Sequence, residues 1–247
     1  GALASLTLPG GLAHPHLVRL IAVDPAEYAI VTELCTCDLA KHVSDNRGKL
    51  TNGNHAKLMQ DVACGGAWLA AKQYVHRDLK MKNILIANSG SGCVAKLADF
   101  GLARPSVEKL RPAGTLLYMA PESTEGHFSE KSDVYGFAFV VLGTYNEAEV
   151  DETNFMQQSV GDAGRSFSEM GALAALAGLA PLLRPLMEAM HRQKALLQAV
   201  KDGSRPEISA RVPPEVTRQI RAAWDKDAEK RPSFALLCRH FKQMASG

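Results

Sequence analysis

The stretch His76-Arg77-Asp78-Leu79-Lys80-Met81-Lys82-Asn83 decides how the rest of this chain is interpreted. The carboxylate of Asp78 can accept the proton of a hydroxyl group, and the ammonium group of Lys80 can neutralise a phosphate. The carboxamide oxygen of Asn83 can hold a divalent metal ion. Since these are three needs of one reaction, the stretch is interpreted as a catalytic loop.

Two shorter motifs follow this stretch in the chain. Asp99-Phe100-Gly101 begins twenty-one residues after Asp78 (99 minus 78) and adds a second carboxylate beside a flexible glycine. Ala120-Pro121-Glu122 follows as a third marker. In their order and spacing, the three motifs resemble those of the protein kinase family.

The resemblance implies an α+β, protein kinase-like fold, with a mostly helical large lobe and an incomplete β-rich small lobe. It places a partial small lobe at residues 1–34 and the large lobe at 35–247, with an insertion at about 144–192. Val200 to Pro206 looks like the tyrosine-kinase-like branch of the family, and the resemblance continues through Arg231 to Phe234.

Composition sets wide limits on the fold and the partners. With 247 residues, of which 46% are hydrophobic, the chain can bury a sizeable core. The net charge of +2 gives no support for binding nucleic acid or a membrane surface through bulk electrostatics. The apolar run from Gly171 to Leu183 is shorter than the about 18 residues that a membrane span needs. This composition predicts a soluble, globular protein, and no signal peptide is visible.

The five cysteines are Cys35, Cys37, Cys64, Cys93 and Cys238. An odd number without the paired spacing of a zinc site predicts reduced thiols, as in the cytosol.

The first part of the chain resembles the middle of a kinase small lobe. Pro9-Gly10-Gly11 would end any helix formed by the preceding residues. His14 to Leu20 resembles the turn and strand after the regulatory helix, and Tyr28 to Thr32 is predicted to be the next strand.

Three elements of the family pattern are absent from the sequence: the glycine-rich loop, the strand lysine and the helix glutamate. No acidic residue occurs before Asp24. The alternative to an active kinase is therefore a pseudokinase scaffold that binds partners without catalysis. We expect residues 1–247 alone to show weak or absent activity. A small-molecule phosphotransferase is disfavoured, because Gly114 to Glu122 resembles a peptide-docking segment.

By the same resemblance, residues around the first strands and after the catalytic loop would hold ATP. Thr32 corresponds to the gatekeeper, and Glu33 and Cys35 lie in the hinge, whose backbone would contact the adenine. Leu85 resembles the residue under the adenine ring. A strand end running into a loop, and a core leucine, are the structural alternatives for these positions.

Two amphipathic or apolar segments are predicted to be helices. In Asn52 to Lys72, four residues share one face, and Asn52 or Asn54 is a candidate cap. These four residues are Leu58, Val62, Gly65 and Leu69. Lys131 to about Leu142 resembles the buried central helix of the large lobe. Ile84 to Ile86 and Val94 to Ala98 are predicted strands.

Between about Thr144 and Arg192 the resemblance lapses. Ser166-x-x-Glu169 has the pattern of a capping box, and Pro181 and Pro185 are expected to interrupt the apolar segment that follows. Packing against the large lobe is the favoured role of this insertion, and contact with a partner is the alternative.

The resemblance implies specific roles in phosphoryl transfer from ATP. Asp78 would accept the proton of the substrate hydroxyl, Lys80 would contact the γ-phosphate, and Asn83 with Asp99 would hold Mg²⁺. Lys80 together with Thr115, the substrate-positioning residue, points to serine or threonine of a protein substrate as the acceptor.

Other residues would have structural roles. His76 and Phe100 would stack inside the protein, and Glu122 would pair with Arg231. Asp133 would accept hydrogen bonds from the catalytic-loop backbone.

Arg77 precedes the catalytic aspartate, and in this family such an arginine often receives a phosphate on the activation segment. The only hydroxyl between Asp99 and Gly114 is that of Ser106. We therefore expect Ser106 to be the phosphorylated switch, or no such switch to operate.

Overall fold

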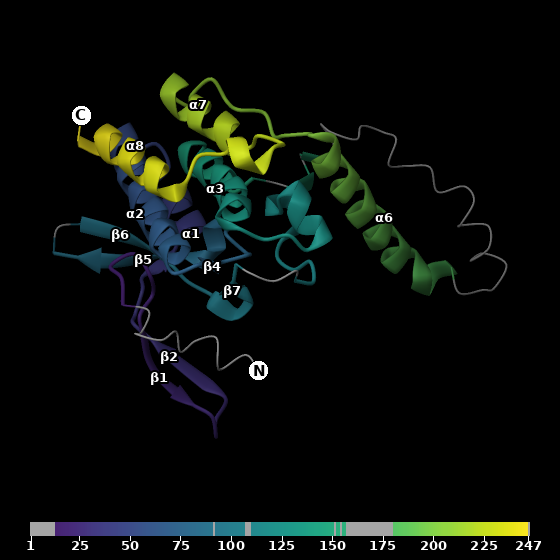
Figure 1. Ribbon diagram of the computed structural model, residues 1–247, viewed down its shortest axis with the longest axis horizontal. Helices are drawn as coiled ribbons and strands as arrows, with labels where there is room; N and C mark the ends of the chain where they lie inside the picture. Colours follow the sequence, from purple (N-terminus) through teal and green to yellow (C-terminus); the bar gives the residue numbers. More distant parts are fainter. Residues whose placement is uncertain are drawn as a thin grey trace. The chain divides into compact units, whose positions relative to one another are not determined.

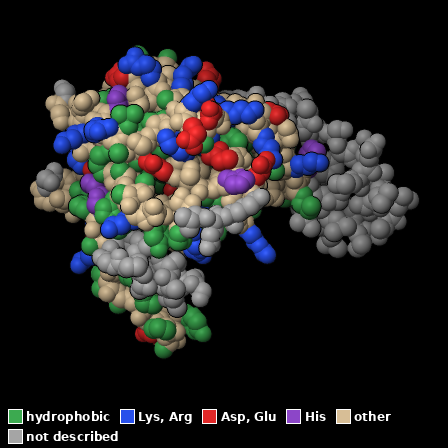
Figure 2. Space-filling model, in the orientation of Figure 1, with side chains coloured by type: hydrophobic (Ala, Val, Ile, Leu, Met, Phe, Trp, Pro, Cys, Tyr) green, Lys and Arg blue, Asp and Glu red, His purple; other side chains and the backbone are tan. Residues whose placement is uncertain are grey.

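The structure is a computed structural model that describes residues 13–90, 92–106, 110–150, 152–153, 155–156 and 180–246 (Figure 1). Two compact units are present: Gly1–Glu149 with Ile208–Gly247, and Val150–Glu207. The lobe boundary predicted at residue 34 stays a prediction. On the face shown in Figure 2, basic and acidic side chains are interspersed, in keeping with the small net charge.

The first unit contains a small three-stranded sheet. Its strands β3 (Cys37–Asp38), β5 (Ile84–Ser89) and β6 (Gly92–Leu97) are antiparallel in the order β3-β5-β6. Ile84, Ile86 and Leu97 are buried, because alternate residues of a strand face the core. The predicted strands are therefore confirmed. A separate pair joins β4 (Tyr74–Val75) to β7 (Arg104–Pro105).

Five α-helices and five 3-10 turns complete this unit among the described residues. The helices are α1 (Leu39–Asp45), α2 (Asn52–Ala71), α3 (Glu130–Tyr145), α7 (Pro214–Ala223) and α8 (Phe234–Ser246). The 3-10 turns are η2 (Met81–Asn83), η3 (Phe100–Leu102), η4 (Leu116–Tyr118), η5 (Pro121–Glu125) and η7 (Ala228–Lys230). Nearly every residue of α3 is buried, so the prediction of a buried apolar helix is confirmed.

Helix α2 has the amphipathic face that the sequence predicts. Leu58, Val62, Gly65 and Leu69 are all buried. The expected cap was wrong, because the N-cap is Thr51, whose hydroxyl accepts a hydrogen bond from the Asn54 N–H. The Asn54 side chain bonds back to the Thr51 N–H and completes a capping box.

Helix α8 lies along α2, as Figure 1 shows. The close approach depends on Gly66, where a Cβ atom would lie 2.7 Å from the ring of Phe234. Phe137 of α3 contacts Phe234 and Phe241 edge-on, with ring centroids 5.6 and 6.0 Å apart. Aromatic packing therefore fixes the C-terminal helix on the core.

A disulfide between Cys64 of α2 and Cys238 of α8 also joins these helices, with the Cα atoms 5.2 Å apart. The prediction that all five cysteines are reduced was wrong for this pair. Nothing in the local sequence marks the pair, since the two residues are 174 positions apart and meet only through helix packing. Cys35, Cys37 and Cys93 are free.

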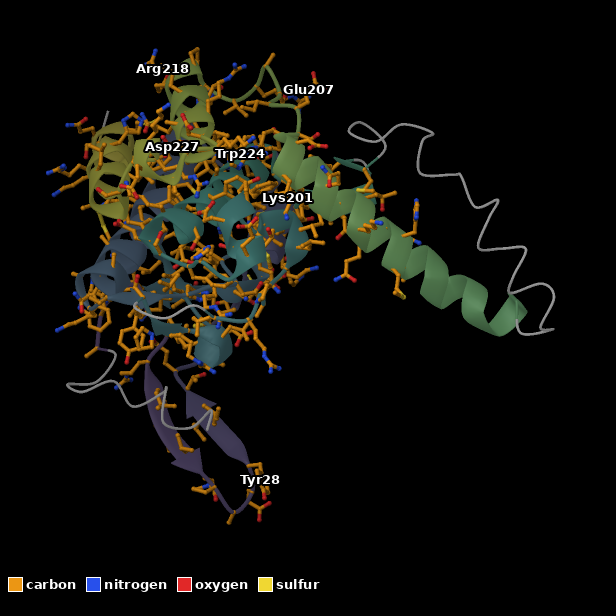
Figure 3. All side chains as sticks on the ribbon, turned by 45° about the vertical axis from the view of Figure 1, so that its right-hand side comes forward. Tyr28, Lys201, Glu207, Arg218, Trp224 and Asp227 are labelled. Carbon is orange, nitrogen blue, oxygen red and sulfur yellow. A yellow bond between two sulfur atoms is a disulfide. The ribbon has the colours of Figure 1, made fainter. Side chains whose placement is uncertain are left out.

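A two-stranded hairpin precedes the β3-β5-β6 sheet in the chain. Strands β1 (Leu20–Asp24) and β2 (Ala29–Thr32) pair antiparallel, and Asp24 Oδ1 accepts hydrogen bonds from the turn at Ala26 and Glu27. The turn expected within 14–20 is present at residues 15 and 16, whereas the strand expected after it begins only at Leu20. Figure 3 shows Tyr28 at the tip of the hairpin, where it is 93% exposed.

In the second unit the main described element is α6 (Ala180–Asp202). The expectation that Pro181 and Pro185 interrupt the apolar segment was wrong for Pro185, because α6 continues through it. Pro181 lies in the first turn, where its missing N–H has no intrahelical partner to lose. The predicted capping box at residues 166–169 lies outside the described residues, as does the segment before Pro9.

Among the described residues, no helix is both long enough and apolar enough to cross a membrane.

Candidate active site

The loop from His76 to Asn83, here the 76–83 loop, is anchored by the buried carboxylate of Asp133 in α3. Asp133 Oδ2 accepts a hydrogen bond from the His76 N–H at 2.6 Å, and Oδ1 accepts one from the Arg77 N–H at 2.9 Å. Burial raises the pKa of Asp133 to about 6, although His76 and the two backbone hydrogen bonds oppose this shift. Asp133 therefore meets the backbone of the loop, as the family resemblance implied.

Arg77 has a left-handed backbone conformation, with φ of 72°. A non-glycine residue adopts this conformation only where its surroundings compensate for the strain. The bonds to Asp133 supply such support on one side. The result is a sharp turn that directs the next side chain, Asp78, toward the 99–122 segment.

Asp78 accepts four hydrogen bonds through its carboxylate. Oδ1 accepts from the N–H and the hydroxyl of Thr115, at 2.9 and 2.8 Å. Oδ2 accepts from Lys80 Nζ at 2.8 Å and Asn83 Nδ2 at 2.9 Å. Burial alone would raise the pKa of Asp78, but the bonds from Lys80 and Thr115 outweigh it and lower this pKa. The carboxylate is therefore ionised at neutral pH and able to accept a proton.

Lys80 connects the 76–83 loop to the segment that follows. Its ammonium group donates to Asp78 and, at 2.9 Å, to Thr115 Oγ1. Gly114 makes this contact possible, since its φ is 111° and a Cβ atom there would overlap the carbonyl oxygen of Arg77. Four of the residues predicted from the sequence thus form one hydrogen-bonded cluster: Asp78, Lys80, Asn83 and Thr115.

His76 and Phe100 form an internal contact, with ring centroids 5.4 Å apart. His76 is buried, and its Nε2 lies 2.8 Å from the Ala98 carbonyl oxygen. This places the histidine between the 76–83 loop and the strand end that leads to Asp99, away from the Asp78 carboxylate cluster.

A pocket of about 520 Å³ lies between the hairpin and the end of β6. Thr32, Leu85, Asn83 and Asp99, all predicted site residues, line it. Its volume is within the range of small-molecule sites, and most of its exposed surface is apolar.

Glu33 and Cys35 do not line this pocket. The Glu33 N–H donates to the Arg19 carbonyl at 2.9 Å, and the Glu33 side chain bonds to Lys96. The Glu33 N–H is therefore not free to donate to an adenine. The Glu33 carbonyl and the Cys35 backbone stay candidate contacts.

The donor set at one end of the pocket fits a magnesium ion. Asn83 Nδ2 donates to both the backbone carbonyl and the carboxylate of Asp78, at 2.8 and 2.9 Å, which turns Asn83 Oδ1 away from that residue. Asp99 is exposed, and its carboxylate is engaged only by the Gly101 N–H at 3.4 Å among the described residues. Amide and carboxylate oxygens are suitable Mg²⁺ ligands. No cluster of three or more His, Cys, Asp or Glu residues that could hold a metal alone occurs in the described ranges.

Glu122 and Arg231 form a bidentate ion pair, with distances of 2.6 and 2.9 Å. The Arg231 side chain is fully buried and also donates to the carbonyls of Asp225 and Lys131. The pair thereby connects the end of the 99–122 segment to the turn before α8.

The Arg77 guanidinium already has partners on the 99–122 segment. It donates to the carbonyls of Leu102 and Arg111, at 3.3 and 2.6 Å, and lies over the ring of Phe128. Ser106 is bound through its backbone N–H to the Gln73 carbonyl. Residues 107–109 lie outside the described part, and the Ser106 switch stays a hypothesis.

Sequence reasoning missed the charged contacts made by Lys96 and by Asp61. Lys96 pairs with Glu33, and Asp61, which is fully buried in α2, pairs with Lys57 and lies 3.5 Å from His16 Nδ1. Asp61 is four residues after Lys57, a spacing that could have been noticed on a predicted helix. Lys96 lies 63 positions from Glu33, and only the fold brings them together.

Comparison with known proteins agrees with this geometry. Residues 4–241 match the family described as protein tyrosine and serine/threonine kinase, and the chain belongs to this family. The resemblance that the motifs carried, and the α+β kinase-like fold, are therefore confirmed.

Several curated proteins are similar to the chain. The probable serine/threonine-protein kinase roco7 of Dictyostelium discoideum is 28% identical over 245 residues, covering 96% of this chain and 8% of its own length. The probable serine/threonine-protein kinase PBL17 of Arabidopsis thaliana is 37% identical over 153 residues, covering 57% of this chain and 34% of its own. The dual specificity protein kinase shkE of D. discoideum is 29% identical over 232 residues, covering 90% and 27%. The chain thus spans about a third of these relatives' length or less.

Proposed function

We propose that this protein transfers the γ-phosphoryl group of ATP to a serine or threonine hydroxyl of a protein substrate. The observation that carries the proposal is the contact of Asp78, Lys80 and Thr115 within one cluster, beside a pocket lined by Asn83 and Asp99. A proton acceptor, a cation and two metal-binding oxygens in adjacent positions are the needs of phosphoryl transfer.

Asp78 would accept the proton of the incoming hydroxyl group. Its lowered pKa keeps it ionised, and the four donors around it fix its orientation. Lys80 lies against the same carboxylate, so its ammonium group would neutralise charge on the transferred phosphoryl group.

ATP would lie with its base against the apolar end of the pocket, near Val18, Leu20 and Leu85. Its phosphates would lie at the end formed by Asn83 and Asp99. Mg²⁺, when bound there by the oxygens of these two residues, would neutralise phosphate charge.

The contact of Lys80 with Thr115 supports serine or threonine as the acceptor. We also propose a cytoplasmic location, a small lobe within residues 1–34 and a large lobe within 35–247. For the 144–192 segment we propose packing against the large lobe, with partner binding as the alternative.

The test is phosphate transfer from radiolabelled ATP to a generic protein substrate by the protein that carries this domain. We expect phosphoserine or phosphothreonine in the product and a loss of at least about 100-fold in Asp78→Asn, because the proton acceptor is removed. Lys41→Met, in an exposed pair of α1, is the matched surface control and should keep full activity. Mg²⁺-dependent ATP binding without transfer, equal in wild type and Asp78→Asn, would instead support a pseudokinase.

A further inference from the structure

An ion pair behind the nucleotide pocket connects three separate segments of the chain. Lys96 Nζ of β6 donates to Glu33 Oε1 at 2.8 Å, and the same oxygen accepts the Arg19 N–H at 2.7 Å. The Glu33 N–H returns a bond to the Arg19 carbonyl at 2.9 Å. Glu33 thus makes two hydrogen bonds to the backbone of Arg19, the residue before β1. Its carboxylate also binds Lys96 of β6.

Each member of this junction is next to a wall of the pocket. Arg19 lies between Val18 and Leu20, and both of these line the pocket. Glu33 follows Thr32, which also lines it.

Lys96 reaches the third wall through strand pairing. It is directly opposite Leu85 in the β5–β6 register, and Asp99 follows three residues later. None of Arg19, Glu33 and Lys96 lines the pocket. A side chain in this position can act on a bound nucleotide only by fixing the segments that touch it.

The pair is sheltered enough to have an effect. The Lys96 and Glu33 side chains are 15% and 19% exposed, compared with 63% and 55% for the Lys41–Asp45 pair of α1. Sheltered charge-assisted hydrogen bonds are screened less by solvent than exposed ones. Burial raises the pKa of Glu33, but the bonds from Lys96 and Arg19 outweigh it, and the net pKa is lowered.

Given the proposed function, we infer that Glu33 and Lys96 are positioning residues for ATP, which hold the three walls of the pocket at the spacing that the nucleotide needs. Backbone hydrogen bonds of Leu97 with His16 and Val18 still hold the start of the hairpin to β6, so loss of the Lys96–Glu33 bond frees the Thr32 side of the pocket to move away from β6. Affinity for ATP then falls, while the cluster around Asp78, which shares no hydrogen bond with this junction among the described residues, keeps its geometry.

The experiment measures binding of a fluorescent ATP analogue with Mg²⁺ to the protein that carries this domain, together with the melting temperature. Lys96→Met is expected to raise Kd roughly tenfold, the loss that corresponds to one such bond. Lys96→Arg retains the donor and is expected to bind within about twofold of wild type. Lys41→Met removes an exposed pair of equal N–O distance and is expected to leave Kd unchanged.

A second pair of variants separates positioning from general stability. Glu33→Gln keeps an oxygen for Arg19 but loses the charge, so its effect should be smaller than that of Glu33→Ala. In the active protein, Lys96→Met should raise KM for ATP and leave kcat and KM for the protein substrate unchanged.

The outcomes are distinct. Wild-type protein that binds Mg²⁺-ATP, with a Lys96→Met Kd within twofold of wild type, overturns the inference and leaves the proposed function intact. Wild-type protein that does not bind overturns the proposed function. If Lys96→Met does not fold, Lys96→Gln and Glu33→Gln carry the same comparison.

Discussion

The 76–83 loop and the β1–β2 hairpin border the same pocket but are built in opposite ways. The loop is fixed by long-range hydrogen bonds to buried groups, such as those to Asp133, 57 and 56 positions away. The hairpin is held by pairing between neighbouring strands and exposes large apolar side chains. These include Ile21, Tyr28, Ile30 and Val31, with exposed fractions from 46% to 93%.

The two regions should therefore differ in how much a mutation destabilises the protein. Polar groups that are buried must keep their partners, and each lost partner is costly. Substitution of a side chain that is exposed to water changes the free energy of unfolding little. Substitutions of buried polar groups should therefore destabilise the protein far more than substitutions in the hairpin.

The largest loss is expected for Glu122→Ala. It removes the bidentate partner of fully buried Arg231 and leaves a buried charge unpaired. We expect a loss of about 3 to 5 kcal/mol in the free energy of unfolding. Urea denaturation gives this value, with Asp45→Ala, from an exposed pair, as the control. A loss below about 1 kcal/mol in Glu122→Ala would contradict the assignment of the pair as a main anchor.

Reduction of the Cys64–Cys238 disulfide should have the next largest effect. The bond closes a long loop between α2 and α8, so its loss should lower the free energy of unfolding by about 2 to 4 kcal/mol. The comparison is urea denaturation with and without a reducing phosphine. Cys64→Ser should remove the difference and Cys93→Ser should not. Equal stability of the oxidised and reduced wild type would show that the bond does not constrain the fold.

Asp133→Asn tests the anchor of the 76–83 loop. An amide provides one acceptor where two are needed, so the N–H of either His76 or Arg77 loses its partner. We expect a loss of about 1 to 3 kcal/mol, with faster amide hydrogen exchange at those two residues. Unchanged exchange there, beside unchanged exchange in the hairpin, would mean that Asp133 does not support the loop.

The pH dependence of stability should show the buried His55. Burial lowers the pKa of His55, and the nearby Glu147 only partly offsets this. Because the pKa of His55 in the folded state is below the unfolded value of 6.5, the contribution of neutral His55 to the free energy of unfolding is fully present above pH 6.5. It is lost as the pH falls through the lowered pKa.

The measurement compares urea midpoints of wild type and His55→Leu at pH 7.5 and pH 5. The wild type should lose more stability on acidification than the variant. Asp133, whose raised pKa has the opposite effect, is present in both proteins, so its contribution cancels when the two losses are compared. An equal or smaller loss in the wild type would contradict the assignment.

The smallest effect is expected in the hairpin. Tyr28→Ser removes an aromatic ring that is 93% exposed at the tip, and the free energy of unfolding should change by no more than about 0.5 kcal/mol. Thermal denaturation checks this. A loss above about 1 kcal/mol would show that the tip packs against something in solution and would weaken the contrast with the loop.

The sequence predicted the regular elements of the first unit well, because they follow local patterns. The buried face of α2 and the apolar helix α3 are visible from spacing alone. The choice of Thr51 over Asn52 or Asn54 as the cap was missed, since all three residues cap helices well and a one-residue shift decides.

The candidate site was predicted residue by residue, but its bonding was not. Spacing identifies Asp78 and Thr115, yet the four hydrogen bonds to the Asp78 carboxylate depend on the backbone turns at Arg77 and Gly114. The disulfide and the Lys96–Glu33 bond join residues far apart in the chain, and no local pattern encodes such pairs. Pro185 shows a different kind of error: proline usually interrupts a helix, but α6 continues through this residue.

If Asp78, Lys80, Asn83 and Asp99 form one phosphoryl-transfer site, a crystal structure of the protein that carries this domain, with Mg²⁺ and a non-hydrolysable ATP analogue, should show it. We expect metal-bound phosphates between Asn83 and Asp99, with the γ-phosphate within hydrogen-bond reach of Lys80. A nucleotide bound elsewhere, or a triphosphate directed away from Asp99 at saturating concentration, would contradict it.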